Sequence, residues 1–148
     1  MAQKQQAVTK VSKSLLKLLN EAIARELQVA VQYMWQHVQW GGVKGFAVQS
    51  ELKSIAIAEM KHAEAIAERL FYLGDIPTTK PNPIYVGTTL KQMIAQDIKD
   101  EANAIDFYKE IIAQATKEKD VTTAFIFKEI LEQEEDHHDT FTTLMEDL

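Results

Sequence analysis

The stretch LKSIAIAEMKHAEAIAERL, residues 52–70, has the spacing of an amphipathic helix but carries a charged residue in the middle of its apolar stripe. Its apolar side chains recur every three or four residues, which places them on one face of an α-helix. That face holds Leu52, Ile55, Ala56, Ala63, Ile66 and Leu70, with Glu59 at its centre. Because burying a carboxylate is costly unless a cation pairs with it, Glu59 indicates a special role for this helix.

Glycine and proline divide the rest of the chain into similar segments. The five Gly and three Pro gather in two clusters, at 41–45 and 74–87, and residues 88–148 contain neither. Since these residues are the main punctuation between elements, the segments between them are long helices. A polar stretch ending in an N-cap candidate, Asp120, divides the last segment. We therefore predict an all-α protein with helices at about 10–40, 44–73, 88–117 and 120–146.

The connections between these helices predict a four-helix bundle that forms one domain over residues 1–148. Short breaks make antiparallel pairs of the first and second helices and of the third and fourth. The proline-rich segment 75–87 is long enough to cross the length of the bundle between the pairs. No apolar run approaches the roughly 18 residues that span a bilayer, and the N-terminal residues lack a signal-peptide pattern. We therefore expect a cytoplasmic protein with no membrane partner.

Each predicted helix carries a glutamate at the centre of its apolar stripe, and no Lys or Arg occurs on these stripes. The four are Glu26, Glu59, Glu101 and Glu134. Four buried carboxylates need compensating positive charge, which a multivalent metal would provide. The chain has no cysteine, which excludes thiolate zinc sites and iron–sulfur clusters, so Glu, Asp and His must hold any metal.

Two histidines complete a repeated pattern. His62 and His137 each follow a central glutamate by three residues, so each pair lies on one helix face. An offset of 75 residues carries Glu26, Glu59 and His62 onto Glu101, Glu134 and His137. Glu135 and His138 repeat the spacing in the next register, and His138 stays an alternative ligand within reach of the buried face. His37 is about 16 Å along the helix axis from Glu26 and cannot share its metal.

This ligand set suits a pair of iron or manganese ions, because oxygen and imidazole ligands favour such metals. Glu59 and Glu134 lie on the helices that also supply histidine, which makes them the candidate bridging ligands, with Glu26 and Glu101 terminal. Such a site supports two-electron transfer to O₂ or H₂O₂.

The chain resembles the bacterioferritins of the ferritin-like superfamily over about residues 12–142. The similarity lies in Glu26-Leu27 with Gln32-Tyr33, in Glu59-Met60-Lys61-His62-Ala63, in Asp97 before Glu101, and in Glu129-Ile130-Leu131 before Glu134-Glu135. The resemblance implies a ferroxidase centre that oxidises Fe(II), in a homo-oligomer that forms a hollow shell for iron storage. It also implies a haem b ligated by Met60 from each of two subunits, whereas an apolar helix contact would explain Met60 equally well.

Several positions depart from the family pattern. Ser54 and Ala58 replace the inner-surface iron ligands, and Thr140 replaces an expected tryptophan, which leaves Tyr33 as the nearest redox-active aromatic residue. Eleven residues follow His137, so we expect no fifth helix. The predicted number of subunits therefore stays open, from a dimer to a shell of 24.

Two other functions agree with parts of the pattern. One is a rubrerythrin-type protein that reduces peroxide, although the absent cysteines remove its rubredoxin module. The other is a DNA-protecting ferritin-like shell, because residues 1–20 contain no acidic residue and four lysines that could contact DNA: Lys4, Lys10, Lys13 and Lys17. The formal charge of −6 and a solvated start of the first helix argue against nucleic acid as a partner.

Overall fold

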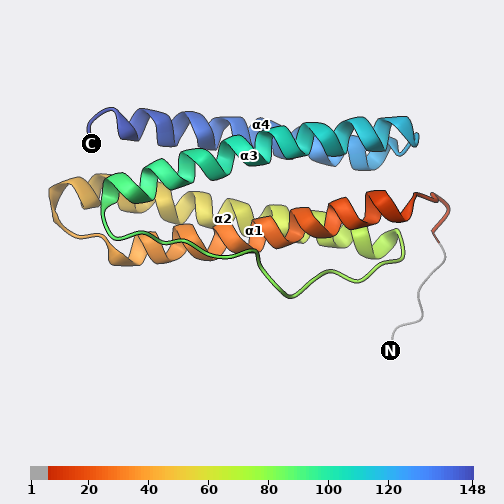
Figure 1. The fold of residues 1–148 in the computed structure, drawn as a ribbon, viewed down its shortest axis with the longest axis horizontal. Coiled ribbons are helices and arrows are strands. Elements are labelled where there is room, and N and C mark those ends of the chain that lie inside the picture. Colours follow the sequence, from red (N-terminus) through yellow and green to blue (C-terminus); the bar gives the residue numbers. More distant parts are fainter. Residues whose placement is uncertain (1–6) are drawn as a thin grey trace.

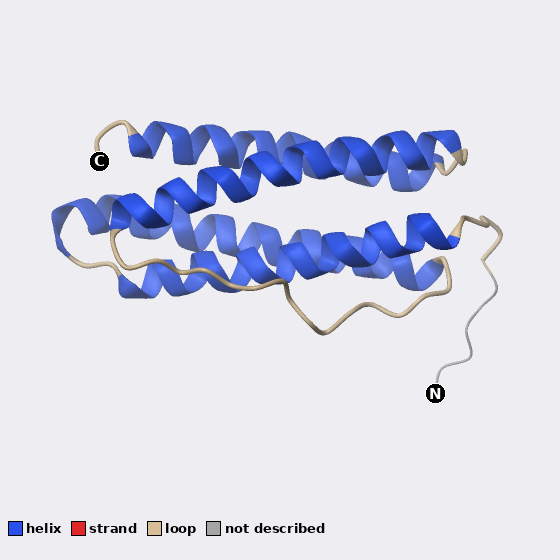
Figure 2. Cartoon of the chain, viewed as in Figure 1, coloured by secondary structure: helices blue, strands red, loops and turns tan. Residues whose placement is uncertain are grey.

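A computed structural model describes residues 7–148 and contains four α-helices in that range, with no strand (Figures 1 and 2). The helices are α1 (Lys13–Gln39), α2 (Gly42–Tyr72), α3 (Leu90–Lys117) and α4 (Val121–Met145). Their boundaries differ from the predicted ones by only a few residues at each end. The all-α bundle is therefore confirmed.

Side-chain caps explain where three of the helices begin. The predicted cap is present: Asp120 accepts a hydrogen bond from the backbone amide of Thr123 at 3.2 Å. Ser12 caps α1 in the same way, at 3.0 Å from the Leu15 amide, and Thr89 caps α3. The end of α2 uses glycine instead, because Gly74 has a positive φ of 100° that other residues rarely adopt.

The helices form two antiparallel hairpins, α1 with α2 and α3 with α4, that pack face to face (Figure 1). The crossover from α2 to α3 runs back along the outside of α1. Its backbone is fixed by hydrogen bonds to α1: the Asn20 side chain bonds Ile76 and Thr78, and the Asn82 amide bonds the Ala24 carbonyl at 3.1 Å. The crossover thus brings the chain back to the end of the bundle where α2 begins, without entering the core (Figure 1).

The core consists of two apolar clusters separated by polar side chains. One cluster includes Leu19, Tyr108 and Phe127, and the other includes Leu52 and Phe141. All six apolar residues predicted for the stripe of α2 are buried. The four central glutamates are also fully buried, so the apolar clusters close both ends of a polar layer.

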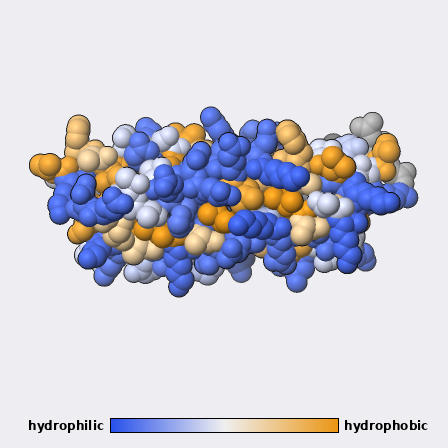
Figure 3. All heavy atoms as spheres, turned by 90° about the horizontal axis from the view of Figure 1, so that it is seen from above, coloured by the Kyte–Doolittle hydropathy of each residue, from blue (hydrophilic) through white to orange (hydrophobic). Residues whose placement is uncertain are grey.

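The face drawn in Figure 3 is mainly hydrophilic, with apolar patches between the hydrophilic side chains. Within residues 7–148, none of the four helices contains an apolar stretch of the length that a membrane span requires. Of the lysines near the N-terminus, Lys17 pairs with Glu21 at 3.8 Å, whereas Lys4 lies outside the described residues.

Candidate metal centre

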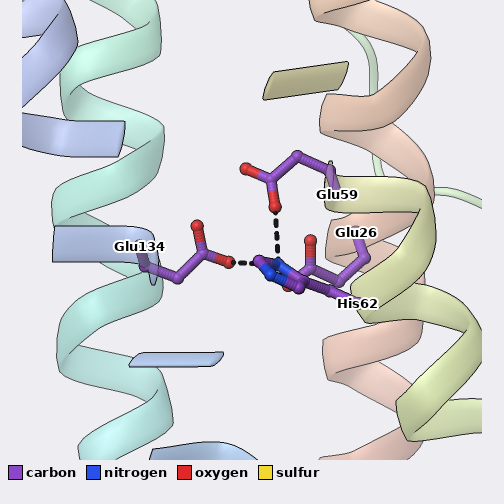
Figure 4. Close-up of side chains that lie close together, drawn as sticks. All are labelled: Glu26, Glu59, His62 and Glu134. Carbon is purple, nitrogen blue, oxygen red and sulfur yellow. Dashed lines mark hydrogen bonds and ion pairs between the residues drawn. The ribbon is translucent and has the colours of Figure 1, made fainter. Parts of the chain in front are cut away.

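The four central glutamates, one from each helix, meet in the middle of the bundle. Together with His62 and His137 they form two groups, and within each group the ligand atoms all lie within 4.8 Å of one another. One group contains Glu26 and His62, the other contains Glu101 and His137, and both contain Glu59 and Glu134. Figure 4 shows Glu59, Glu26 and His62 from one hairpin and Glu134 from the other pointing into the same space. All six predicted residues are brought together.

The two histidines lie between the shared glutamates. His62 Nδ1 is 2.9 Å from Glu59 Oε2 and 3.3 Å from Glu134 Oε1. His137 Nδ1 is 3.2 Å from Glu59 Oε1 and 3.2 Å from Glu134 Oε2. Each histidine therefore faces one oxygen of each shared glutamate, and the rings stack with centroids 5.9 Å apart.

One cation in the site was not predicted. Arg25, which the helical phase places off the stripe of α1, turns its long side chain inward and is only 8% exposed. Its Nη1 lies 3.1 Å from Glu134 Oε1 and its Nη2 lies 3.3 Å from Glu101 Oε2. No Lys or Arg lies on the stripes themselves, but the conclusion that none pairs with these carboxylates is wrong, because side-chain length lets a residue beside the stripe enter the core.

Burial and mutual repulsion set the protonation of the site. Burial raises the pKa of Glu26, and it raises the pKa of Glu101 to about 8. Burial and the charge of Glu101 would also raise the pKa of Glu59, but Arg25 and the histidines outweigh them and lower it. Burial alone would lower the pKa of His137, yet hydrogen bonds to carboxylates raise it to about 10.

Two buried tyrosines hold the terminal glutamates in a crossed arrangement. The Tyr33 hydroxyl of α1 donates to Glu101 Oε1 of α3 at 2.7 Å, and the Tyr108 hydroxyl of α3 donates to Glu26 of α1. Tyr108 was missed from the sequence. The signal was available, because the offset of 75 residues that relates the ligands also carries Tyr33 onto Tyr108.

The remaining histidines and Glu135 lie outside the centre. Glu135 is exposed, and His138 belongs to neither of the two groups found among residues 7–148. His37 Nδ1 lies 2.7 Å from the Gln49 carbonyl, which gives that histidine a local structural partner.

Met60 points away from the centre to the outer face of α1 and α2. It is 48% exposed and lines an apolar pocket of about 370 Å³ with Val31, Met34, Trp35 and Ile57 among other residues. Its position separates it from the six central side chains.

Comparison with known proteins identifies the family. Residues 16–148 match the family model of the ferritin-like domain. Bacterioferritin of Desulfovibrio desulfuricans is 34% identical over 124 residues, which cover 83% of this chain and 69% of the relative. The chain belongs to the bacterioferritin family of ferritin-like proteins. Bacterioferritin of Mycolicibacterium paratuberculosis is 32% identical, with 89% of this chain and 84% of the relative covered.

Solved bacterioferritin structures agree with the fold. The crystal structure of Desulfovibrio desulfuricans bacterioferritin, a protein with a diiron site, matches with a TM-score of 0.85 and 30% identity. The match covers 90% of this chain and 78% of that one. Mycobacterium tuberculosis bacterioferritin matches with a TM-score of 0.86 and 25% identity, covering 93% and 87%.

Proposed function

We propose that this bacterioferritin-family chain is an iron-storage protein that oxidises Fe(II) at a centre formed by its six central side chains: Glu26, Glu59, His62, Glu101, Glu134 and His137. The observation that carries the proposal is the pair of ligand groups that share Glu59 and Glu134. Two groups with shared carboxylates can hold two ions side by side, as in di-iron carboxylate bundles. Glu59 and Glu134, which belong to both groups, would be the ligands that the two ions share.

The chemistry of the donors fits such ions. Each group offers three carboxylates and one imidazole, a set that suits iron or manganese. Glu101 Oε2 is buried and accepts no hydrogen bond; its charged neighbour is Nη2 of Arg25 at 3.3 Å, so protein donors do not fully satisfy this carboxylate oxygen. Four carboxylates balance the charge of two divalent ions. These features support metal binding by the central layer rather than a purely structural role for it.

Two Fe(II) ions bound there supply two electrons, which with two protons convert O₂ to H₂O₂ or convert H₂O₂ to two waters. The chain's own residues prepare this transfer. Tyr33 donates a hydrogen bond to Glu101 and fixes the orientation of that terminal carboxylate. This closeness to the centre supports Tyr33 as the redox-active aromatic residue of the proposal. Tyr108 fixes Glu26 in the same way. The apolar clusters on both sides keep bulk water away from the layer.

Assembly and haem are the further parts of this proposal. Membership of the bacterioferritin family supports a homo-oligomeric shell that stores the oxidised iron, in the cytoplasm. The exposed thioether of Met60 in its apolar pocket of about 370 Å³ supports a haem b site shared with Met60 of a second copy. Native mass measured together with iron and haem content tests assembly and cofactor in one experiment.

Anaerobic titration with Fe(II) tests the central proposal. The protein should bind two ions per chain and oxidise them rapidly when O₂ is admitted. Glu59→Gln removes a ligand of both groups, so it should abolish binding at both positions. Glu64→Gln changes an exposed glutamate of the same helix and serves as the matched control.

Undiminished binding and rate in Glu59→Gln would refute the proposal. Comparison of O₂ with H₂O₂ then identifies the oxidant. A strong preference for H₂O₂ would place the chain beside the rubrerythrin-type peroxide reducers.

A further inference from the structure

The guanidinium of Arg25 occupies the middle of the carboxylate layer and contacts all four glutamates. Its Nη1 lies 3.3 Å from Glu26 Oε2, 3.1 Å from Glu134 Oε1 and 3.7 Å from Glu59 Oε1. Its Nη2 lies 3.3 Å from Glu101 Oε2 and 3.3 Å from the Asp100 carbonyl. Among residues 7–148, no other Arg or Lys lies within ion-pair distance of these glutamates. One side chain thus neutralises part of the charge of both ligand groups.

This arrangement makes Arg25 a competitor of divalent ions. The carboxylates that it contacts are the same four that the two ligand groups use. Two divalent ions already balance four carboxylates, so a guanidinium in the same place would add an uncompensated positive charge. Like charges at such separations repel strongly in a buried site, where water screens little. Ions and guanidinium therefore cannot all occupy the centre favourably.

A pocket beside Arg25 has room for a second position of its side chain. A surface pocket of about 470 Å³ between α1 and α3 is lined by Arg25, Glu21, Asn82, Asn103 and two apolar residues. Glu21 lies one helical turn before Arg25, the spacing at which oppositely charged side chains pair along a helix. In the inward position the Nε of Arg25 is buried and makes no hydrogen bond. The inward contacts are thus incomplete, and the pocket offers a carboxylate and two amide side chains.

We propose that Arg25 is an internal counter-cation that holds the four carboxylates together until divalent ions displace it into the pocket beside Glu21. The inference rests on the proposed di-metal function. Arg25 is a positioning residue: it keeps the ligands close without itself binding metal, and it makes the affinity for ions lower than the bare carboxylate set would give.

Calorimetric titration with Co(II), a probe that O₂ does not oxidise readily, tests this in the full-length protein. Arg25→Gln removes the competing charge, so it should raise the Co(II) affinity by at least about tenfold. The same variant should lower the thermal midpoint of chelator-treated protein and leave that of Co(II)-loaded protein close to wild type. Arg69→Gln removes another well-buried arginine, whose partner is Asp120, and should lower both midpoints.

Glu21→Gln provides a second, milder variant. It removes the carboxylate of the outward position, so it should weaken Co(II) binding several-fold while leaving the midpoint of chelator-treated protein unchanged. Glu21 is exposed, so this variant should fold normally.

Three results would overturn the inference. The first is a Co(II) affinity of Arg25→Gln equal to or below that of wild type, and the second is an equal loss of midpoint in chelator-treated and loaded protein. The third is Co(II) binding by Glu21→Gln that matches wild type. If wild-type protein binds no Co(II) or Fe(II), the proposed function itself fails, and the inference with it.

Discussion

Replacing Asp120 by alanine should destabilise the bundle substantially, because this one carboxylate both starts α4 and closes a buried ion pair. Asp120 is 1% exposed, and its Oδ1 lies 2.6 Å from Nη2 of Arg69 on α2. Its oxygens also accept hydrogen bonds from the Thr123 amide at 3.2 Å and from the Thr123 hydroxyl. These contacts join the start of α4 to the end of α2, and so connect the two hairpins.

The magnitude follows from these contacts. Loss of an N-cap costs about 1 kcal/mol. Breaking a buried pair by removing one partner costs about 3–5 kcal/mol. Arg69 keeps a hydrogen bond to the Thr123 hydroxyl at 3.0 Å and lies over the Tyr72 ring at 5.0 Å. These remaining contacts favour the lower end of the range for the cost of breaking the ion pair. We expect a loss of about 4 kcal/mol in the free energy of unfolding. For a domain of this size that lowers the thermal midpoint by about 8–16 °C.

Urea unfolding and thermal unfolding of chelator-treated protein measure the effect. Asp120→Asn retains an acceptor for the cap and loses the charge, so it should lie between wild type and Asp120→Ala. Glu132→Ala, at an exposed position of the same helix, should change stability little. A loss below about 1 kcal/mol in Asp120→Ala would refute the reasoning, since it would mean that the ion pair contributes no more than an exposed one.

Other predictions concern the central layer and the outer face. Tyr33→Phe should slow the oxidation of bound Fe(II) without changing the number of ions bound, as seen by stopped-flow absorbance; an unchanged rate would remove Tyr33 from the reaction. Raising the pH from about 5 to about 10 should lower the thermal midpoint of chelator-treated protein. The reason is that the raised pKa values of Glu101, about 8, and His137, about 10, make the folded state hold protons that the unfolded chain has lost. A midpoint that rises over this range would contradict those shifts. Met60→Ala should abolish the haem absorbance of protein purified with haem, and persistence of that absorbance would place the haem elsewhere.

Helical spacing and chain breakers predicted the helices, and phase predicted which side chains meet. Glu59 and His62 are fixed by backbone geometry, because a short side chain on the stripe can point only into the core. The repeat of 75 residues identified the matching pair on α4 and rejected Glu135, which is exposed. These features depend on local periodicity, which a sequence displays directly.

The inward position of the Arg25 side chain could not be predicted from the sequence, for a physical reason. Its position beside the stripe leaves two directions open to a long, flexible side chain, and the choice between them depends on charges contributed by three other helices. Only the assembled bundle decides that choice. Tyr108 differs, because the repeat contains it and a wider comparison of the two halves would have found it.

The crossed tyrosines show that the chain is built from one hairpin design used twice. Each hairpin supplies a tyrosine to the other's terminal glutamate, and the crossover between them supplies no ligand to the centre. A centre built this way needs only one kind of hairpin, because two copies facing each other supply both ligand groups. The repeat is broken where its two halves must differ: the offset partner of Arg25 is Asp100, so the two hairpins together place a single guanidinium among the four glutamates.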